Sequence, residues 1–275
     1  MKQKRGKVRG TVGALAGLAA AYAAGNFLTA DLVAKKYSGK SAFDIGAGNP
    51  GMASIGSELG SGPAVITLFG DAFKTAAAQW LMIALSSPAL PREDAAMLAG
   101  TAVTLGHCFP ATHNFRGGKG VATMTTAQMI AWPAWGIPSA LIGLGSVIAT
   151  QYLCIGGVAI PAVFLLGALL TKKSPLFVLC AFVNLAVAAY AHGPAIAGIP
   201  SGETPKTDVL RAFEGVADKV SVAVSQATDG VISDVTENVL HEFVLSSVPS
   251  LQHELNARLA SLGDSLDHAF SQLTR

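Results

Sequence analysis

Residues 105–123 read Leu105-Gly106-His107-Cys108-Phe109-Pro110-Ala111-Thr112-His113-Asn114-Phe115-Arg116-Gly117-Gly118-Lys119-Gly120-Val121-Ala122-Thr123. One long apolar run precedes this segment and another follows it, so we expect a polar site at the mouth of an apolar helix bundle. Gly117, Gly118 and Gly120 lack a Cβ atom, which lets backbone N–H groups approach a ligand closely. Arg116 and Lys119 add positive charge beside those donors. This combination predicts an anion site and favours phosphate.

The glycine-rich part of this segment allows a second interpretation. It does not fit a Walker loop, because Gly120 stands where the magnesium-holding Ser or Thr is required. A glycine turn between two membrane helices, with Arg116 and Lys119 as interfacial charges, is the alternative. The apolar surroundings and the upstream His107 favour a ligand site.

The composition is that of a membrane protein. Of the 275 residues, 51% are hydrophobic and 13% charged, where soluble domains have about 25% charged residues. Mean hydropathy is +0.48. We therefore predict an all-α, polytopic membrane helix bundle. The net charge of +2 and the absence of a Lys/Arg block beyond residue 9 give no indication of nucleic-acid binding. Three cysteines stand singly in apolar runs without metal-ligand spacing, so we expect packed free thiols and no metal.

The N-terminal part combines a basic start with an apolar run. Five Lys or Arg residues fall within the first nine positions, and residues 11–28 are mainly apolar. This pattern is typical of a secretory signal peptide and also of a retained first membrane helix. Because the apolar character continues through Leu32 and Val33, the retained helix is favoured.

The polar segment 35–62 contains Gly46-Ala47-Gly48-Asn49-Pro50-Gly51. Its glycines and Pro50 predict a tight, non-helical loop. Either it is a plain interfacial turn, or Gly48, Asn49 and Gly51 present donors to an anion. The next apolar run, 63–85, contains Asp71 and Lys74, which share a helix face and can pair. They are secondary site candidates, with a purely structural ion pair as the alternative.

The number of later crossings decides which face His192 joins. The first polar loop and residues 112–120 share one face, so His192 joins them only after an even number of crossings within 121–191. Three full-length spans is the simple interpretation. Four short helices, making about seven in all, would give one shared face. We expect the apolar run over residues 121–191 to be interrupted at these positions: Pro133, Pro138, Gly156-Gly157 and Lys172.

The cation distribution bears on orientation. The face with the loops carries five Lys or Arg residues and the opposite face eight. The positive-inside rule would then place the loops outside the cell.

The C-terminal part differs in character, which predicts three regions: a membrane domain over 1–195, a linker over 196–205 and an amphipathic helical tail over 206–275. Apolar residues recur at helical spacing in the tail, and its polar face has mixed charge. Mixed charge favours self-association or a protein partner over an anionic membrane surface. A loosely ordered tail is the alternative.

Together, these segments resemble the bacterial acyl-phosphate-dependent glycerol-3-phosphate acyltransferases, the PlsY family, over about residues 12–195. The resemblance is carried by the Gly46–Gly51 loop, the Asp71/Lys74 pair, Gly106–Pro110 and Phe115–Thr123. It implies a seven-helix enzyme of the bacterial inner membrane whose three motifs meet at the cytoplasmic face. It further implies transfer of an acyl group from acyl phosphate to the 1-hydroxyl of glycerol 3-phosphate, without a cofactor or metal.

The resemblance also implies residue roles. Catalytic candidates are His107, Lys119 and His192, with His107 orienting loops or substrate and His192 opening the third motif. Substrate-binding candidates are Gly48, Asn49, Gly51, Arg116, Gly117, Gly118 and Gly120. Several positions depart from the family pattern: Ala47, Ala53, Ser54 and Phe43 in the first motif, and Gly193-Pro194 where an asparagine and an arginine are usual. The alternative function is therefore a non-catalytic relative that binds lipid or a partner through its tail, and a transporter or channel ranks last.

Overall fold

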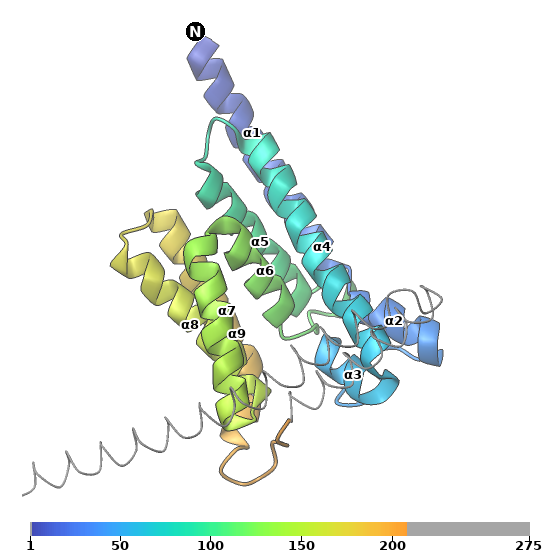
Figure 1. The fold of residues 1–275 in the computed structure, drawn as a ribbon. Coiled ribbons are helices and arrows are strands. Elements are labelled where there is room, and N and C mark those ends of the chain that lie inside the picture. The colour runs from blue at the N-terminus through green and yellow to red at the C-terminus, as the bar shows by residue number, and fades with distance from the viewer. Residues whose placement is uncertain (1, 208–275) are drawn as a thin grey trace, which may run out of the picture. The chain divides into compact units, whose positions relative to one another are not determined.

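The computed structural model of the protein describes residues 2–207, and within them every regular element is helical (Figure 1). The elements in chain order are α1 (Lys2–Asn26), α2 (Thr29–Ser38), α3 (Met52–Leu59), α4 (Ser61–Ser86), α5 (Arg92–Cys108), the 3-10 turn η1 (Ala111–His113), α6 (Val121–Ala131), α7 (Pro133–Thr150), α8 (Leu153–Leu170) and α9 (Pro175–Ala197).

Four stretches of residues 2–207 are long and apolar enough to cross a membrane: Val8–Ser38, Pro133–Thr150, Leu153–Leu170 and Pro175–Ala197. Large apolar side chains also point outward, including Phe69 and Phe73 on α4, Leu141 on α7 and Phe182 on α9. Such an exposed apolar surface suits contact with lipid. The protein is a multi-pass, all-helical membrane protein, as predicted, and the number of seven crossings stays a prediction.

Small residues let α1 pack closely on α5 and α4. Gly25 of α1 and Gly106 of α5 face each other so closely that a Cβ on either would overlap the other helix's backbone. Gly13 lies against the backbone of Leu85 on α4 in the same way. Close backbone approach through small residues is a usual way to join helices within a membrane. The Gly25–Gly106 contact fixes the end of α5, after which the polar residues 109–120 leave the bundle.

Four helices, α6 to α9, follow the glycine-rich segment, and three of them, α7, α8 and α9, are long and apolar enough to cross a membrane, so the number of crossings after residue 121 stays a prediction. The four helices run alternately away from and back toward the end of the bundle where the loops lie, and α9, which carries His192 in its last two turns, ends there (Figure 1). The expected breaks at Pro133 and Lys172 are found. Pro133 is the first residue of α7, where a missing N–H leaves no hydrogen bond unmade.

The expected breaks near Pro138 and Gly156 are wrong. Pro138 lies inside α7, and Gly156 and Gly157 lie inside α8, which begins after Gln151-Tyr152. The two glycines serve packing instead, because a Cβ on Gly156 would overlap Val147 and one on Gly157 would overlap the His192 ring. A glycine that permits close contact and a glycine that ends a helix look the same in a sequence.

The C-terminal predictions are largely outside the described residues. Helix α9 extends to Ala197, beyond the expected end of the membrane domain at 195, and turns follow it. The Thr204 hydroxyl donates to the carbonyl of Ala195, and Thr207 N donates to the carbonyl of Gln151. The predicted tail lies outside the described residues from position 208 onward, so the three-region division stays a prediction.

Candidate active site

Three segments meet at one end of the bundle. They are the first loop (residues 39–51) between α2 and α3, the glycine-rich loop (residues 109–120) between α5 and α6, and the end of α9 (Figure 1). The first two touch directly, because a Cβ on Gly118 would lie 2.7 Å from the carbonyl oxygen of Pro50. The rings of Phe43 and His113 also stack, with centroids 5.6 Å apart. The end of α9 joins them through Tyr190, whose ring lies 5.8 Å from that of Phe109.

The glycine-rich loop folds back onto the end of α5. Gly118 N donates to the His107 carbonyl at 3.0 Å, and a Cβ on Gly117 would overlap that same carbonyl. Gly120 has a positive φ of 77° and immediately precedes α6. Helix α6 therefore begins beside Lys119, and its first-turn N–H groups and positive dipole end lie at the loop. This arrangement is suited to an anion.

Lys119 and His192 lie together at this end of the bundle. Lys119 is half-buried in the glycine-rich loop, and His192 lies near the end of α9, two residues after Tyr190, whose ring contacts Phe109. His192 is only 3% exposed, and neither of its ring nitrogens has a hydrogen-bond partner within residues 2–207. Since buried polar atoms are nearly always hydrogen-bonded, an unpartnered imidazole at this end of the bundle marks a place for a polar ligand.

Asp71, Lys74 and His107 form a buried cluster next to the glycine-rich loop. The predicted pair is present, with Lys74 Nζ 2.8 Å from Asp71 Oδ1. Lys74 Nζ also lies 3.1 Å from His107 Nδ1, and the Thr29 hydroxyl donates to Asp71 at 3.1 Å. The two charges, three residues apart on α4, are therefore joined to the site through His107.

The first loop has the non-helical form predicted for it. Gly46 and Gly48 both have positive φ, at 53° and 64°. The loop is held by Asp31 of α2, whose Oδ1 accepts from the Ser41 hydroxyl and from Ala42 N. Sequence reasoning missed Asp31, although an acidic residue inside an otherwise apolar N-terminal run is the signal that identifies it.

Asp31→Ala is expected to loosen the first loop and to lower the free energy of unfolding by about 1.5–3 kcal/mol, because two donors lose a charged acceptor. Thermal unfolding in detergent and limited proteolysis within residues 41–48 measure the effect. The matched control is Asp44→Ala, since Asp44 is exposed in the same loop. Equal stability of the two variants would contradict this role of Asp31.

Residues at the end of α1 hold the glycine-rich loop and were also missed. The Tyr22 hydroxyl donates to the Phe109 carbonyl at 2.8 Å, and Thr112 N donates to Asn26 Oδ1 at 3.3 Å. No local pattern identifies these contacts, which join residues more than 80 positions apart.

The structure thus brings most predicted site residues to one place. The group consists of His107, Gly117, Gly118, Lys119, Gly120 and His192, with Asn49 and Gly51 flanking Pro50 of the adjoining first loop. Gly48 and Arg116 are more exposed than the rest. Within residues 2–207, no group of three or more His, Cys, Asp or Glu side chains is placed to hold a metal ion.

Comparison with known proteins identifies the family. The family model described as "Glycerol-3-phosphate acyltransferase" matches residues 15–202. The chain belongs to this acyltransferase family. The matched range contains every candidate site residue, from Gly48 to His192. The resemblance to PlsY seen in the sequence is therefore confirmed.

Relatives of this acyltransferase include proteins of other bacteria and solved structures. Glycerol-3-phosphate acyltransferase of Alkaliphilus metalliredigens is 32% identical over 186 residues, covering 68% of this chain and 92% of the relative. Glycerol-3-phosphate acyltransferase 1 of Lactobacillus johnsonii is 40% identical over 148 residues, covering 53% of this chain and 68% of the relative. The crystal structure of PlsY, an integral membrane glycerol 3-phosphate acyltransferase, in its glycerol 3-phosphate form is 25% identical, with a TM-score of 0.65 over 73% of this chain and 98% of PlsY.

Proposed function

We propose that the protein transfers a fatty acyl group from acyl phosphate to the 1-hydroxyl of glycerol 3-phosphate, giving lysophosphatidic acid and phosphate for phospholipid synthesis. The observation that carries this proposal is the placement of Lys119, the glycine-rich loop and the unpartnered His192 at one end of a membrane helix bundle. Both proposed substrates carry a phosphate, and the named relatives act on glycerol 3-phosphate.

The chemistry requires positioning more than a protein nucleophile. Acyl phosphate is a mixed anhydride, so its phosphate leaves readily when the acceptor hydroxyl attacks the acyl carbonyl carbon. The new ester C–O bond forms as the bond to phosphate breaks. His192 has a free acceptor nitrogen for the hydroxyl proton. Lys119 and the backbone N–H groups of the loop stabilise the charge that collects on the phosphate.

One experiment tests this activity. The full chain is purified in detergent and supplied with palmitoyl phosphate, and phosphate release is measured with and without glycerol 3-phosphate. Release that depends on the acceptor, together with formation of lysophosphatidic acid, supports the proposal. Absence of turnover with glycerol 3-phosphate overturns it.

A second function is favoured by the end of α9. Gly193 and Pro194 follow His192 directly and offer no side-chain donor where the family pattern has an asparagine and an arginine. A missing arginine removes a bidentate phosphate ligand. The second candidate is therefore a non-catalytic relative that binds lipid or a protein partner, the latter through residues 206–275. Binding of palmitoyl phosphate that free phosphate does not compete away, together with no phosphate release in the same assay, would favour this candidate.

We place the protein in the bacterial plasma membrane with the site facing the cytoplasm, as in the family pattern and against the Lys/Arg count. Single cysteines at Lys40 and Arg92, both exposed and at opposite ends of the bundle, test the orientation. The three native cysteines are buried, so background labelling should be low. An impermeant thiol reagent is expected to label Arg92→Cys in intact cells and Lys40→Cys only after permeabilisation. The reverse pattern would place the site outside.

A further inference from the structure

The Lys74 ammonium has a complete set of acceptors inside the protein. An ammonium has three N–H donors and no acceptor. Lys74 Nζ lies 2.8 Å from Asp71 Oδ1, 2.8 Å from the Phe27 carbonyl oxygen and 3.1 Å from His107 Nδ1. Each donor therefore has one acceptor, and Nδ1 of His107 is the acceptor of the third contact. Both Lys74 and His107 are buried, at 8% and 3% exposure.

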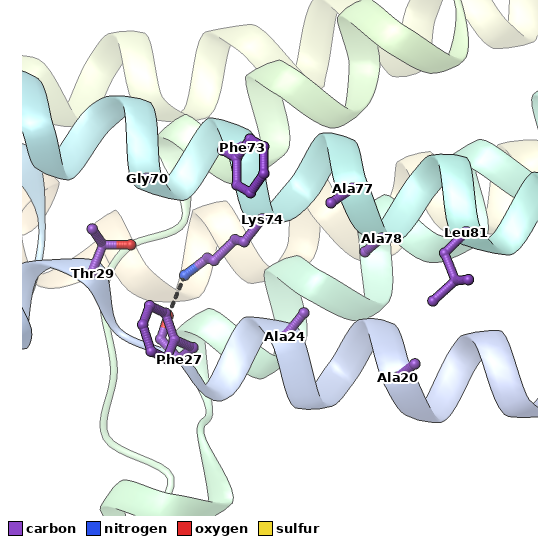
Figure 2. A pocket seen from close by; sticks show the side chains of 10 residues that line it. All are labelled: Ala20, Ala24, Phe27, Thr29, Gly70, Phe73, Lys74, Ala77, Ala78 and Leu81. Carbon is purple, nitrogen blue, oxygen red and sulfur yellow. Dashed lines mark hydrogen bonds between the residues drawn. The ribbon is translucent and has the colours of Figure 1, made fainter.

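The path of the Lys74 side chain shows that its charge is directed inward. Its stem lines an apolar cavity of about 430 Å³ between α1 and α4, among alanine and phenylalanine side chains. Figure 2 shows the ammonium reaching from α4 to the Phe27 carbonyl at the end of α1. The end of α1 also holds the glycine-rich loop through Tyr22 and Asn26. Lys74 thus connects three helices at the base of that loop.

The Lys74 contact favours one protonation state of the His107 ring, because an ammonium can donate but not accept. An imidazolium would present an N–H at Nδ1, so two donors would face each other. A neutral ring whose Nδ1 accepts carries its proton on Nε2. Nε2 is the ring atom nearest to Gly118, where an added Cβ would overlap it. Since Gly118 N also donates to the His107 carbonyl, the loop rests on His107 at two points.

We infer that Asp71 and Lys74 are positioning residues that act through His107: they hold its ring in the neutral, Nε2-protonated tautomer and so fix Gly118 and the glycine-rich loop. Asp71 keeps the Lys74 ammonium in place, and the Thr29 hydroxyl keeps Asp71 in place. The kinetic part of this inference rests on the proposed acyl transfer, whereas the tautomer does not.

The first test is ¹⁵N NMR of the full chain in detergent, labelled at the histidine ring nitrogens. The His107 signals are assigned by their loss in His107→Gln. An Nε2-protonated signature is expected in the wild type and a mixture of tautomers in Lys74→Met, which keeps the apolar stem and removes the donors. An Nδ1-protonated ring, or an unchanged ring in Lys74→Met, would overturn the inference. The wild-type spectrum gives an answer even if the variant does not fold.

The second test compares kinetic parameters with palmitoyl phosphate and glycerol 3-phosphate. Lys74→Met and Asp71→Asn are expected to lower kcat about 10- to 100-fold, the effect of losing one buried charged hydrogen bond. The amide of His107→Gln can place an N–H donor near the Nε2 position, whereas the shorter amide of His107→Asn reaches only the Nδ1 position, where its carbonyl oxygen can accept from Lys74. The Gln variant should therefore retain about tenfold more activity than the Asn variant. Equal activities would overturn the positioning role.

The matched control is Lys173→Met, which removes another lysine–carboxylate contact, with Glu93, at the opposite end of α5. It should change neither the His107 tautomer nor kcat. A comparable kcat loss in this control would show a general effect of ion-pair removal and overturn the inference. A wild type without turnover but with the expected tautomers would instead reject the proposed function and leave the ring assignment standing.

Discussion

Lys119→Ala is expected to lower kcat/KM for palmitoyl phosphate by at least about 100-fold, the typical effect of removing a preorganised charge or donor at a reacting oxyanion. Lys119 is half-buried two residues before the start of α6, close to the first-turn backbone N–H groups of that helix and at the same end of the bundle as the unpartnered His192 ring. The variant leaves the phosphate of either substrate without its nearest ammonium. Acceptor-dependent phosphate release in detergent measures the loss.

The control for this variant is Lys40→Ala, which removes an exposed lysine from the first loop. It should keep near-wild-type turnover, because Lys40 is exposed and outside the proposed site. This control separates the general loss of a cation at this end of the bundle from the loss of the cation at the site. Lys119→Ala should also keep the wild-type unfolding temperature, since Lys119 makes no ion pair within residues 2–207. Turnover of Lys119→Ala within about threefold of wild type would refute the role of Lys119.

Gly118→Ala is expected to reduce activity about 100-fold and to destabilise the protein by about 1–3 kcal/mol, because the added methyl group has no space. It would overlap Nε2 of His107 and lie 2.7 Å from the Pro50 carbonyl oxygen. The His107 ring is held by Lys74, and Pro50 is buried in the first loop. Neither neighbour can move without displacing a second part of the site. Turnover and thermal unfolding in detergent give the two measurements.

Gly145→Ala is the matched control for this substitution. Gly145 lies inside α7, and an added Cβ there would meet no atom within 4 Å. The same chemical change should therefore leave activity unaltered and add up to about 1 kcal/mol of helix stability. If Gly118→Ala matched this control in activity, the close contact between the glycine-rich loop, His107 and the first loop would not be needed for function.

The departures at the end of α9 give the phosphate groups fewer side-chain ligands than the family pattern has. Beside the exposed Arg116, the charged side chain of the glycine-rich loop is the half-buried Lys119, and the other proposed donors are backbone N–H groups of that loop. Backbone N–H groups cannot be removed by side-chain mutation, so the effect of Lys119→Ala measures how far the site depends on its ammonium.

The sequence by itself determined the class of fold and the local form of the loops. Hydropathy and composition predict membrane helices because each helix in a bilayer must satisfy its own backbone hydrogen bonds and present apolar side chains. Glycine and Pro50 predict the non-helical first loop because φ restrictions act on single residues. The motif around Gly117–Gly120 pointed to phosphate because its donors and charges are adjacent in the chain.

Only the tertiary structure decided how these parts meet. Pro133 starts a helix while Pro138 lies inside one, and Gly157 makes room for His192 instead of ending α8. Asn26 and Lys74 hold the site from positions 86 and 33 residues away in the chain. The physical reason is that a residue's backbone preference is local, whereas the need for a small side chain or a buried charge depends on what packs against it. That neighbour is fixed by the arrangement of helices and cannot be read from the residue itself.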